Sequence, residues 1–427
     1  MAGLKLEAGT VNAAGSRATW TMLGIVSAAV LLGMSVWFAA SAVGPDLQAR
    51  WNLSTVETGW LTALVQLGFV AGTLTAALLG VADVLESRHY FAGSALAAAL
   101  ANAALLVVPG FEAALVSRFA TGFFLAGVYP PAMKMTATWF VANRGLAIGV
   151  VVGALTVGKA VPYLVQGLGG GRQVGAGAAG PAAGPVVAIT SAAALLGALL
   201  VFVAYRDGPN AFPRRRFTWE LARIVVRSRR WRLATGGYLG HMWELYAMWT
   251  WIASFLVAAA ASRPMDAPPP LAVGIAPFLV IAAGGLGCVW GGRVADRIGR
   301  EALTIRALAV SGACAVTMGL LYGQPFPVVL AVGLVWGFFV VADSAQFSAA
   351  VTEIVPAHVV GTALTLQVAL GFLLTMATIQ LVPLLVSVVG WRWAFSVLAA
   401  GPAAGIVAMT RLRRLRSVEA AETAAVG

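Results

Sequence analysis

Twelve long apolar segments dominate this sequence and restrict it to one class of fold. A helix needs about 20 predominantly apolar residues to cross a bilayer. In lipid, only helices and closed barrels can satisfy their own backbone hydrogen bonds. Segments of this length therefore predict an all-α membrane protein with twelve transmembrane helices. They cover roughly residues 20–43, 55–79, 89–108, 112–134, 144–166, 185–205, 232–259, 271–292, 303–322, 326–352, 361–387 and 391–410.

The composition supports a membrane protein and argues against a soluble one. Hydrophobic residues make up 60% of the chain and charged residues only 10%, whereas a soluble domain carries about 25% charged residues. The formal charge of +12 suggests nucleic acid at first sight. However, the basic residues lie in short connections between apolar segments, where membrane topology explains them. We therefore expect no nucleic-acid partner.

The distribution of basic residues predicts the orientation. If both termini lie in the cytoplasm, only Arg50, Arg172, Arg263 and Arg392 fall in loops on the other side. Cytoplasmic loops carry an excess of lysine and arginine. We therefore expect a multi-pass protein of the inner (cytoplasmic) cell membrane with both termini in the cytoplasm and an anionic inner leaflet around its basic loops.

The longest basic connection divides the chain into two bundles. We predict a cytoplasmic tail at 1–19, a six-helix bundle at 20–205, a basic linker at 206–231, a second six-helix bundle at 232–410 and a cytoplasmic tail at 411–427. In the linker, Thr218 can cap a helix whose apolar residues are Trp219, Ile224 and Val225 and whose cationic face is supplied by arginines. Such a helix can lie on the inner leaflet. A solvated basic linker is the alternative.

A short charged stretch occurs twice, about half the chain apart. The stronger copy is Gly-Arg-Val-Ala-Asp-Arg-Ile-Gly-Arg at 292–300, and Asp83 marks the weaker one. We expect each copy to be a tight loop at the membrane surface, and a repeat of this period indicates a duplicated bundle. The stretch resembles the loop signature G-x-x-x-D-R-x-G-R of the major facilitator superfamily. The matching residues are Gly292, Arg293, Asp296, Arg297, Gly299 and Arg300.

Other segments add to this resemblance. Arg118 to Gly122 resembles the superfamily's R-x-x-x-G signature in span four. Trp139, Phe140 and Arg144 are weakly similar to the nitrate/nitrite and cyanate branches. The resemblance implies the superfamily's fold, in which two pseudo-symmetric six-helix bundles rock about a central site. It also implies that Asp296 caps the start of span five and that Asp83 caps the start of span eleven.

Charged residues inside the spans are the candidates for function, because burying charge in hydrocarbon is costly. Arg118 and Lys159 would suit an anionic substrate, although both side chains can also extend toward the membrane surface. Glu244 and Asp343 can titrate and carry protons, or can be structural carboxyls that join helices. Glu244 lies about 18 Å along its helix from Arg232, near the bilayer midplane.

Three further residues complete the predicted pathway. His241 lies three positions before Glu244 and shares its helix face, so the two are predicted to form a proton relay. Trp37 and Tyr129 lie on spans that line the pathway in the resembled fold. In span five, Gly145, Gly149 and Gly153 form a small-residue face suited to close helix packing.

These observations predict a secondary transporter and not an enzyme. We expect it to move a small organic or inorganic anion by alternating access, coupled to protons. Efflux of cationic or amphiphilic compounds and proton-independent facilitation remain as alternatives. Cys288 and Cys314 lie within apolar segments and lack zinc-site spacing. We expect no cofactor and no metal, and a monomer whose partners are the substrate, protons and the bilayer.

Overall fold

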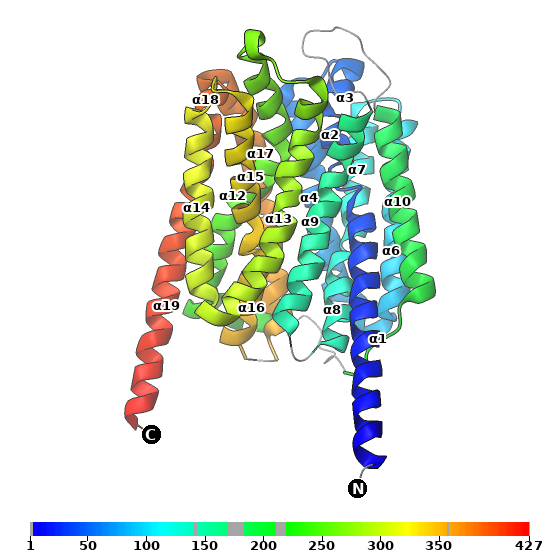
Figure 1. Ribbon diagram of the computed structural model, residues 1–427, viewed down its shortest axis with the longest axis vertical. Helices are drawn as coiled ribbons and strands as arrows, with labels where there is room; N and C mark the ends of the chain where they lie inside the picture. Colours follow the sequence, from blue (N-terminus) through cyan, green and yellow to red (C-terminus); the bar gives the residue numbers. More distant parts are fainter. Residues whose placement is uncertain (1–2, 141–142, 170–182, 211–218, 357, 427) are drawn as a thin grey trace.

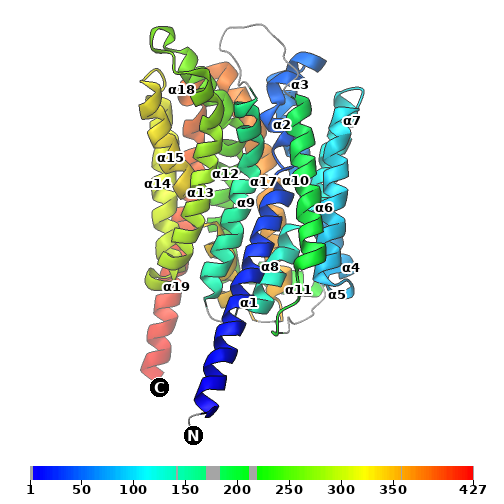
Figure 2. The ribbon, with the colours of Figure 1, turned by 45° about the vertical axis from the view of Figure 1, so that its right-hand side comes forward.

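The computed structural model describes residues 3–140, 143–169, 183–210, 219–356 and 358–426. The residues in these ranges form helices and connections and no strand. Twelve helical segments among them are long and apolar enough to cross a membrane, which confirms the predicted number. Both chain termini lie on the same side of the helical bundle (Figures 1 and 2). We call this side the termini side.

The helices form two bundles that lie side by side (Figure 1). The first contains α1 (Gly3–Met34), α2 (Ala39–Ala42), α3 (Gly44–Trp51), α4 (Thr55–Leu79), α5 (Val81–Val84), α6 (Ser87–Ala103), α7 (Phe111–Leu125), α8 (Tyr129–Trp139), α9 (Arg144–Leu168) and α10 (Ala183–Ala204). The second contains α12 (Arg229–Ala261), α13 (Pro270–Ile298), α14 (Arg300–Leu320), α15 (Phe326–Ala342), α16 (Ser344–Ile354), α17 (Val360–Val389), α18 (Trp391–Ala394) and α19 (Ala400–Val426).

Three spans are interrupted near their middle. The first breaks between α1 and α2, the fourth between α7 and α8, and the tenth at Asp343 between α15 and α16. Pro130 and Pro131 occupy the first turn of α8, where a missing backbone N–H costs little. The interruptions leave backbone carbonyl groups without their usual helical donors, and these groups need partners elsewhere.

Glycines bring α9 and α13 together at the interface between the bundles. A Cβ atom on Gly153 would lie 2.7 Å from the carbonyl oxygen of Gly285, and one on Gly149 would lie 2.9 Å from that of Cys288. The contact continues to Gly145 and Gly292 on the termini side. The small-residue face predicted in span five therefore packs directly on α13.

The stretch at 292–300 is mostly helical, so its prediction as a loop was wrong. Helix α13 continues through Asp296 to Ile298, and α14 begins at Arg300. The turn is made by Gly299 alone, whose φ of +90° lies in a region that side chains disfavour. The charged side chains are therefore held on helical turns instead of a flexible loop.

One other boundary differs from the predictions. Helix α19 continues past residue 410 to Val426, because the sequence after the apolar segment still favours helix. The predicted linker contains the helix α11 (Trp219–Arg227) where a helix was expected, while Thr218 lies outside the described residues. Val225 is buried on α11, whereas Ile224 is exposed, so the two residues do not share one apolar face.

Candidate functional site at the centre of the bundle

A small cavity of about 50 Å³ lies between the two bundles. The first bundle contributes wall residues from the end of α1, from α4, α8 and α9. The second bundle contributes residues from α12, α15, α16 and α17. A site shared by both bundles is the place that a rocking motion exposes to one side and then to the other.

Lys159 is the positively charged residue among the described residues that line the cavity. Its side chain is only 1% exposed, so it does not extend to the membrane surface. The Nζ atom lies 3.8 Å from the ring centroid of Trp37 and 4.6 Å from that of Tyr246. It also donates a hydrogen bond to the Tyr246 hydroxyl. No carboxylate in the described part of the chain forms an ion pair with it.

Arg118 does not line the cavity, although we predicted it in the substrate pathway. Its guanidinium donates to the carbonyl oxygens of Val36 at 3.0 Å and Trp37 at 2.7 Å. It also donates to Asn102 Oδ1 at 2.8 Å. The two carbonyls lie at the break between α1 and α2, where the helical ladder is interrupted and the Val36 oxygen has only a long backbone bond, from the Ala39 N–H at 3.4 Å. Arg118 therefore fixes this break and with it the position of Trp37.

Glu244 forms a comparable junction in the second bundle. Its Oε1 accepts a hydrogen bond from Trp336 Nε1 at 2.7 Å, and its Oε2 accepts one from the Ser311 hydroxyl at 2.8 Å. These contacts join α12 to α14 and α15. Glu244 is buried and does not line the cavity. This arrangement matches the structural carboxyl that was the alternative to a proton carrier.

His241 contacts Asp343 and not Glu244, so the predicted relay partner is corrected. The His241 Nδ1 atom lies 2.9 Å from Asp343 Oδ1, and both side chains are 1% exposed. The break between α15 and α16 places Asp343 beside α12, while the Glu244 carboxylate is taken by Trp336 and Ser311. The spacing of three residues correctly places His241 and Glu244 on one helix face. It does not show that residues of other helices are the partners of both side chains.

The His241–Asp343 pair lies directly behind the cavity wall. Met242 and Ser344, the next residues in the chain, both line the cavity. His241 Nε2 and both carboxylate oxygens of Asp343 have no hydrogen-bond partner among the described residues. The pair is therefore in contact at 2.9 Å while its hydrogen-bonding capacity is unsatisfied.

Trp37 and Tyr129, which were predicted in the pathway, both line the cavity. Phe69, Phe372 and much of the α12 wall were not predicted from the sequence. That wall consists of Tyr238, Met242, Leu245, Tyr246 and Trp249. These residues recur at the spacing of one helical face. The residues predicted on this helix, His241 and Glu244, lie on the neighbouring face, because charge inside a span was the signal used for the prediction.

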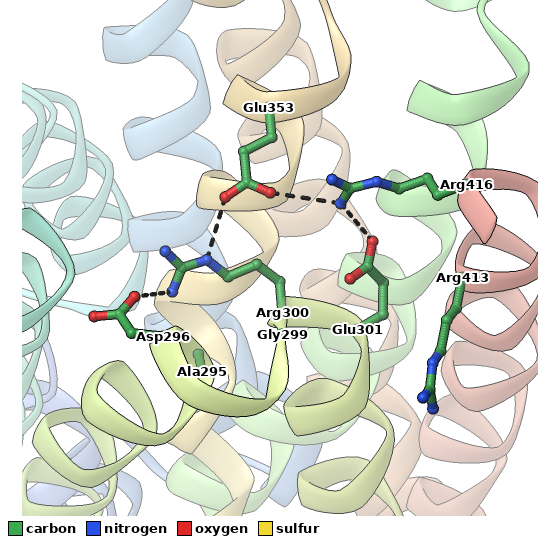
Figure 3. A pocket seen from close by; sticks show the side chains of 8 residues that line it. All are labelled: Ala295, Asp296, Gly299, Arg300, Glu301, Glu353, Arg413 and Arg416. Carbon is green, nitrogen blue, oxygen red and sulfur yellow. Dashed lines mark hydrogen bonds and ion pairs between the residues drawn. The ribbon is translucent and has the colours of Figure 1, made fainter. Parts of the chain in front are cut away.

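A chain of ion pairs surrounds a second pocket of about 310 Å³ on the termini side (Figure 3). Arg300 Nη1 lies 2.8 Å from Asp296 Oδ1, and Arg300 Nε lies 3.4 Å from Glu353 Oε1. Arg416 Nη1, on α19, lies 2.6 Å from Glu301 Oε1 and 3.5 Å from Glu353 Oε2. The network thus joins α13, α14, α16 and α19.

Asp296 also reaches the first bundle. A Cβ atom on Gly145 would lie 3.0 Å from Asp296 Oδ2, so the carboxylate sits against the first turn of α9. A negative charge is favourable at a helix N-terminus. Arg293 and Arg297 are exposed on α13. The side chain of Asp83 lies outside the described residues.

Comparison with known families identifies the fold. The family model of the Major Facilitator Superfamily matches residues 25–378. This chain belongs to the Major Facilitator Superfamily. It is therefore a multi-pass membrane protein and a secondary transporter, from a family whose members are not enzymes.

Individual relatives are distant. A galacturonate transporter from Dickeya chrysanthemi is 30% identical over 149 residues, which cover 34% of this chain and 42% of that protein. Two structures of a bacterial homolog of the human lysosomal transporter Spinster cover 92% of this chain. The inward-facing unoccupied form has a TM-score of 0.67 at 14% identity over 95% of its chain. The inward-facing occupied form has a TM-score of 0.69 at 15% identity over 96% of its chain.

Proposed function

We propose that this superfamily member carries a small anion across the membrane, coupled to protons. The observation that carries the proposal is Lys159, a buried ammonium group in the shared cavity without an acidic partner among the described residues. Burying an uncompensated charge is costly. An anionic substrate would supply the missing countercharge each time the cavity closes.

The rest of the cavity wall supports an anion over a cation. The indole Nε1 atoms of Trp37 and Trp249 have no hydrogen-bond partner in the described structure, and an indole can only donate. Glu244 and Asp343, which a cationic amphiphile would need as countercharges, do not line the cavity. The relative described as a galacturonate transporter also favours a carboxylate as the transported anion.

The His241–Asp343 pair is our proposed proton site. The imidazole and carboxylate are in contact at 2.9 Å, and Asp343 occupies the break between α15 and α16. Protonating Asp343 weakens its attraction to His241, so a proton can change how α12 and α16 pack. Because Met242 and Ser344 line the cavity, such a change in packing would alter the shape of the cavity that holds the substrate.

We further propose that the termini side faces the cytoplasm, with the Asp296 network acting as a gate there. The positive-inside pattern of the loops supports this orientation. The contact between Asp296 and the first turn of α9 bridges the two bundles. A cytoplasm-facing opening must separate these two elements, so the contact favours the state that is closed on this side.

A thermal-shift screen of the purified protein tests anion binding, because a ligand of the folded state raises the unfolding temperature. We would use acetate, benzoate, succinate, galacturonate, nitrate and cyanate, with lipophilic amines as the cationic class. We expect stabilisation by carboxylates and its loss in Lys159→Gln. Arg50→Gln is the matched control, because Arg50 also lies near a tryptophan ring but is exposed. Stabilisation by amines alone would reject the proposal.

A further inference from the structure

We propose that the transported anion is a small monocarboxylate with an apolar body, and not a dicarboxylate or a polyhydroxylated acid. The proposal rests on the anion transport argued above and narrows it to one class of substrate. It follows from three properties of the cavity wall: the number of cations, the kind of polar groups and the position of the aromatic rings.

The wall offers one positive charge. Lys159 is the only charged residue among the described residues that line the cavity. Arg118, the other buried cation of the first bundle, is held by the carbonyl oxygens of Val36 and Trp37 and by Asn102. A second carboxylate on the substrate would lose its hydration without meeting a cation, which is strongly unfavourable.

The polar groups of the wall suit a carboxylate better than a long row of hydroxyl groups. They are the ammonium of Lys159, the indoles of Trp37 and Trp249, and the hydroxyls of Tyr129, Tyr238, Tyr246, Ser344 and Ser348. Among the described lining residues there is no carboxylate, carboxamide or imidazole. The five hydroxyls can accept as well as donate, but the other lining side chains apart from Lys159 and the two indoles are apolar. A substrate hydroxyl that faces one of these apolar side chains loses its hydration without gaining a partner, which costs free energy.

Two of the donors belong to indole rings that lie beside Lys159. The rings of Trp37 and Trp249 lie 3.8 Å and 5.5 Å from Lys159 Nζ, and both indole N–H groups lack partners among the described residues. A carboxylate has two oxygens that each accept more than one hydrogen bond. One carboxylate can therefore use the ammonium group and at least one indole.

Apolar rings line the wall beside these donors. The Phe69 and Phe372 centroids lie 4.6 Å apart, and each lies within 6 Å of the Trp37 ring, at 5.1 Å and 5.7 Å. Both phenylalanines line the cavity. A substrate whose carboxylate meets Lys159 near Trp37 therefore has aromatic carbon close to its body, and an apolar body gains free energy there.

A homologous series of ligands tests this class directly. Full-length protein in nanodiscs would be titrated with acetate, propionate and butyrate by isothermal titration calorimetry. We expect affinity to rise about fourfold for each added methylene, as burial of one CH₂ in an apolar site predicts. We expect succinate, glycerate and galacturonate to bind at least tenfold more weakly than butyrate.

Two variants change the cavity wall, and each has a matched control outside the cavity. Met242→Gln places a carboxamide in the cavity wall and should narrow the gap between glycerate and butyrate. Met265→Gln makes the same exchange at a residue that is 96% exposed and should leave the gap unchanged. Lys159→Gln should weaken the whole monocarboxylate series, while Arg50→Gln should not.

The outcomes separate this inference from the proposed function. Tighter binding of galacturonate or succinate than of butyrate, still dependent on Lys159, would overturn the monocarboxylate proposal and leave anion transport standing. A flat response along the aliphatic series would overturn it too. Absence of binding by every carboxylate, with Lys159→Gln unchanged from wild type, would overturn both.

Discussion

Arg118 donates a hydrogen bond from Nη2 to the carbonyl oxygen of Trp37 over 2.7 Å, deep inside the first bundle. The same nitrogen reaches the carbonyl of Val36, so one guanidinium satisfies both carbonyls at the break in the first span. Trp37 is thereby held with its ring over Lys159. Arg118, which was predicted from the sequence as a substrate ligand, therefore positions Trp37 in the wall of the site.

We predict that Arg118→Gln destabilises the protein and disturbs the cavity. A glutamine cannot reach both carbonyls, and a buried acceptor without a donor costs about 1–3 kcal/mol. Thermal unfolding should therefore begin several degrees lower, and carboxylate binding should weaken. Arg88→Gln removes an exposed arginine that pairs with Glu86 on the surface and should leave both measurements almost unchanged. Equal effects of the two substitutions would argue against the positioning role.

We predict that Gly153→Ala slows transport strongly, although the substitution adds only one methyl group. The new Cβ would lie 2.7 Å from the carbonyl oxygen of Gly285, so α9 and α13 must separate to accept it. Rates in proteoliposomes should fall because the closed packing of the bundles is disfavoured. Gly93→Ala is the matched control, because its Cβ meets nothing within 4 Å. Alanine in a helix interior is about 0.5–1 kcal/mol more favourable than glycine, so this control should be neutral or stabilising.

We predict that Asp343→Asn abolishes accumulation driven by a pH gradient while substrate binding remains. The amide cannot exchange a proton, yet it keeps the shape of the side chain beside His241. Glu244→Gln should instead lower stability, because the Glu244 carboxylate accepts hydrogen bonds from Trp336 and Ser311. Uptake by proteoliposomes under an imposed gradient distinguishes the two. If Asp343→Asn still concentrates substrate, the His241–Asp343 pair does not couple transport to protons.

We predict that Asp296→Asn changes the rate of transport without unfolding the protein. The lost charge interaction with the start of α9 is worth about 0.3–1 kcal/mol, which shifts a conformational equilibrium about two- to fivefold. Expression and thermal stability should stay near wild type. Asp266→Asn, which breaks an exposed ion pair with Arg263 on the opposite side, serves as the control. Unchanged rates in a well-folded Asp296→Asn protein would reject the gating role.

We predict that Ser417 and Met265 lie on different sides of the membrane, with Ser417 in the cytoplasm. Both side chains are exposed. Single cysteines at these positions, in a background without Cys288 and Cys314, can be tested with an impermeant thiol reagent on intact cells. Reagent should reach position 265 only. Labelling at position 417 alone would reverse the proposed orientation.

The sequence by itself determined the architecture of this protein. Runs of about 20 apolar residues predict spanning helices because lipid allows few other backbone arrangements. The number of spans, their duplication into two bundles and the close packing of span five follow from such local patterns. The charged stretch around Asp296 was also found this way, although its helical state was not. Gly299 alone makes the turn, and a run of charged residues does not show where a helix stops.

Only the tertiary structure decided which buried groups meet. Lys159 and Arg118 are both cations inside spans, yet one faces a shared cavity and the other is bound to backbone carbonyls at a helix break. His241 is near Glu244 in sequence but pairs with Asp343 across two helices. These outcomes depend on the rotation of each helix about its axis and on the place where its neighbour is interrupted. Sequence periodicity fixes the face of a helix that residues share, whereas packing against other helices decides what that face contacts.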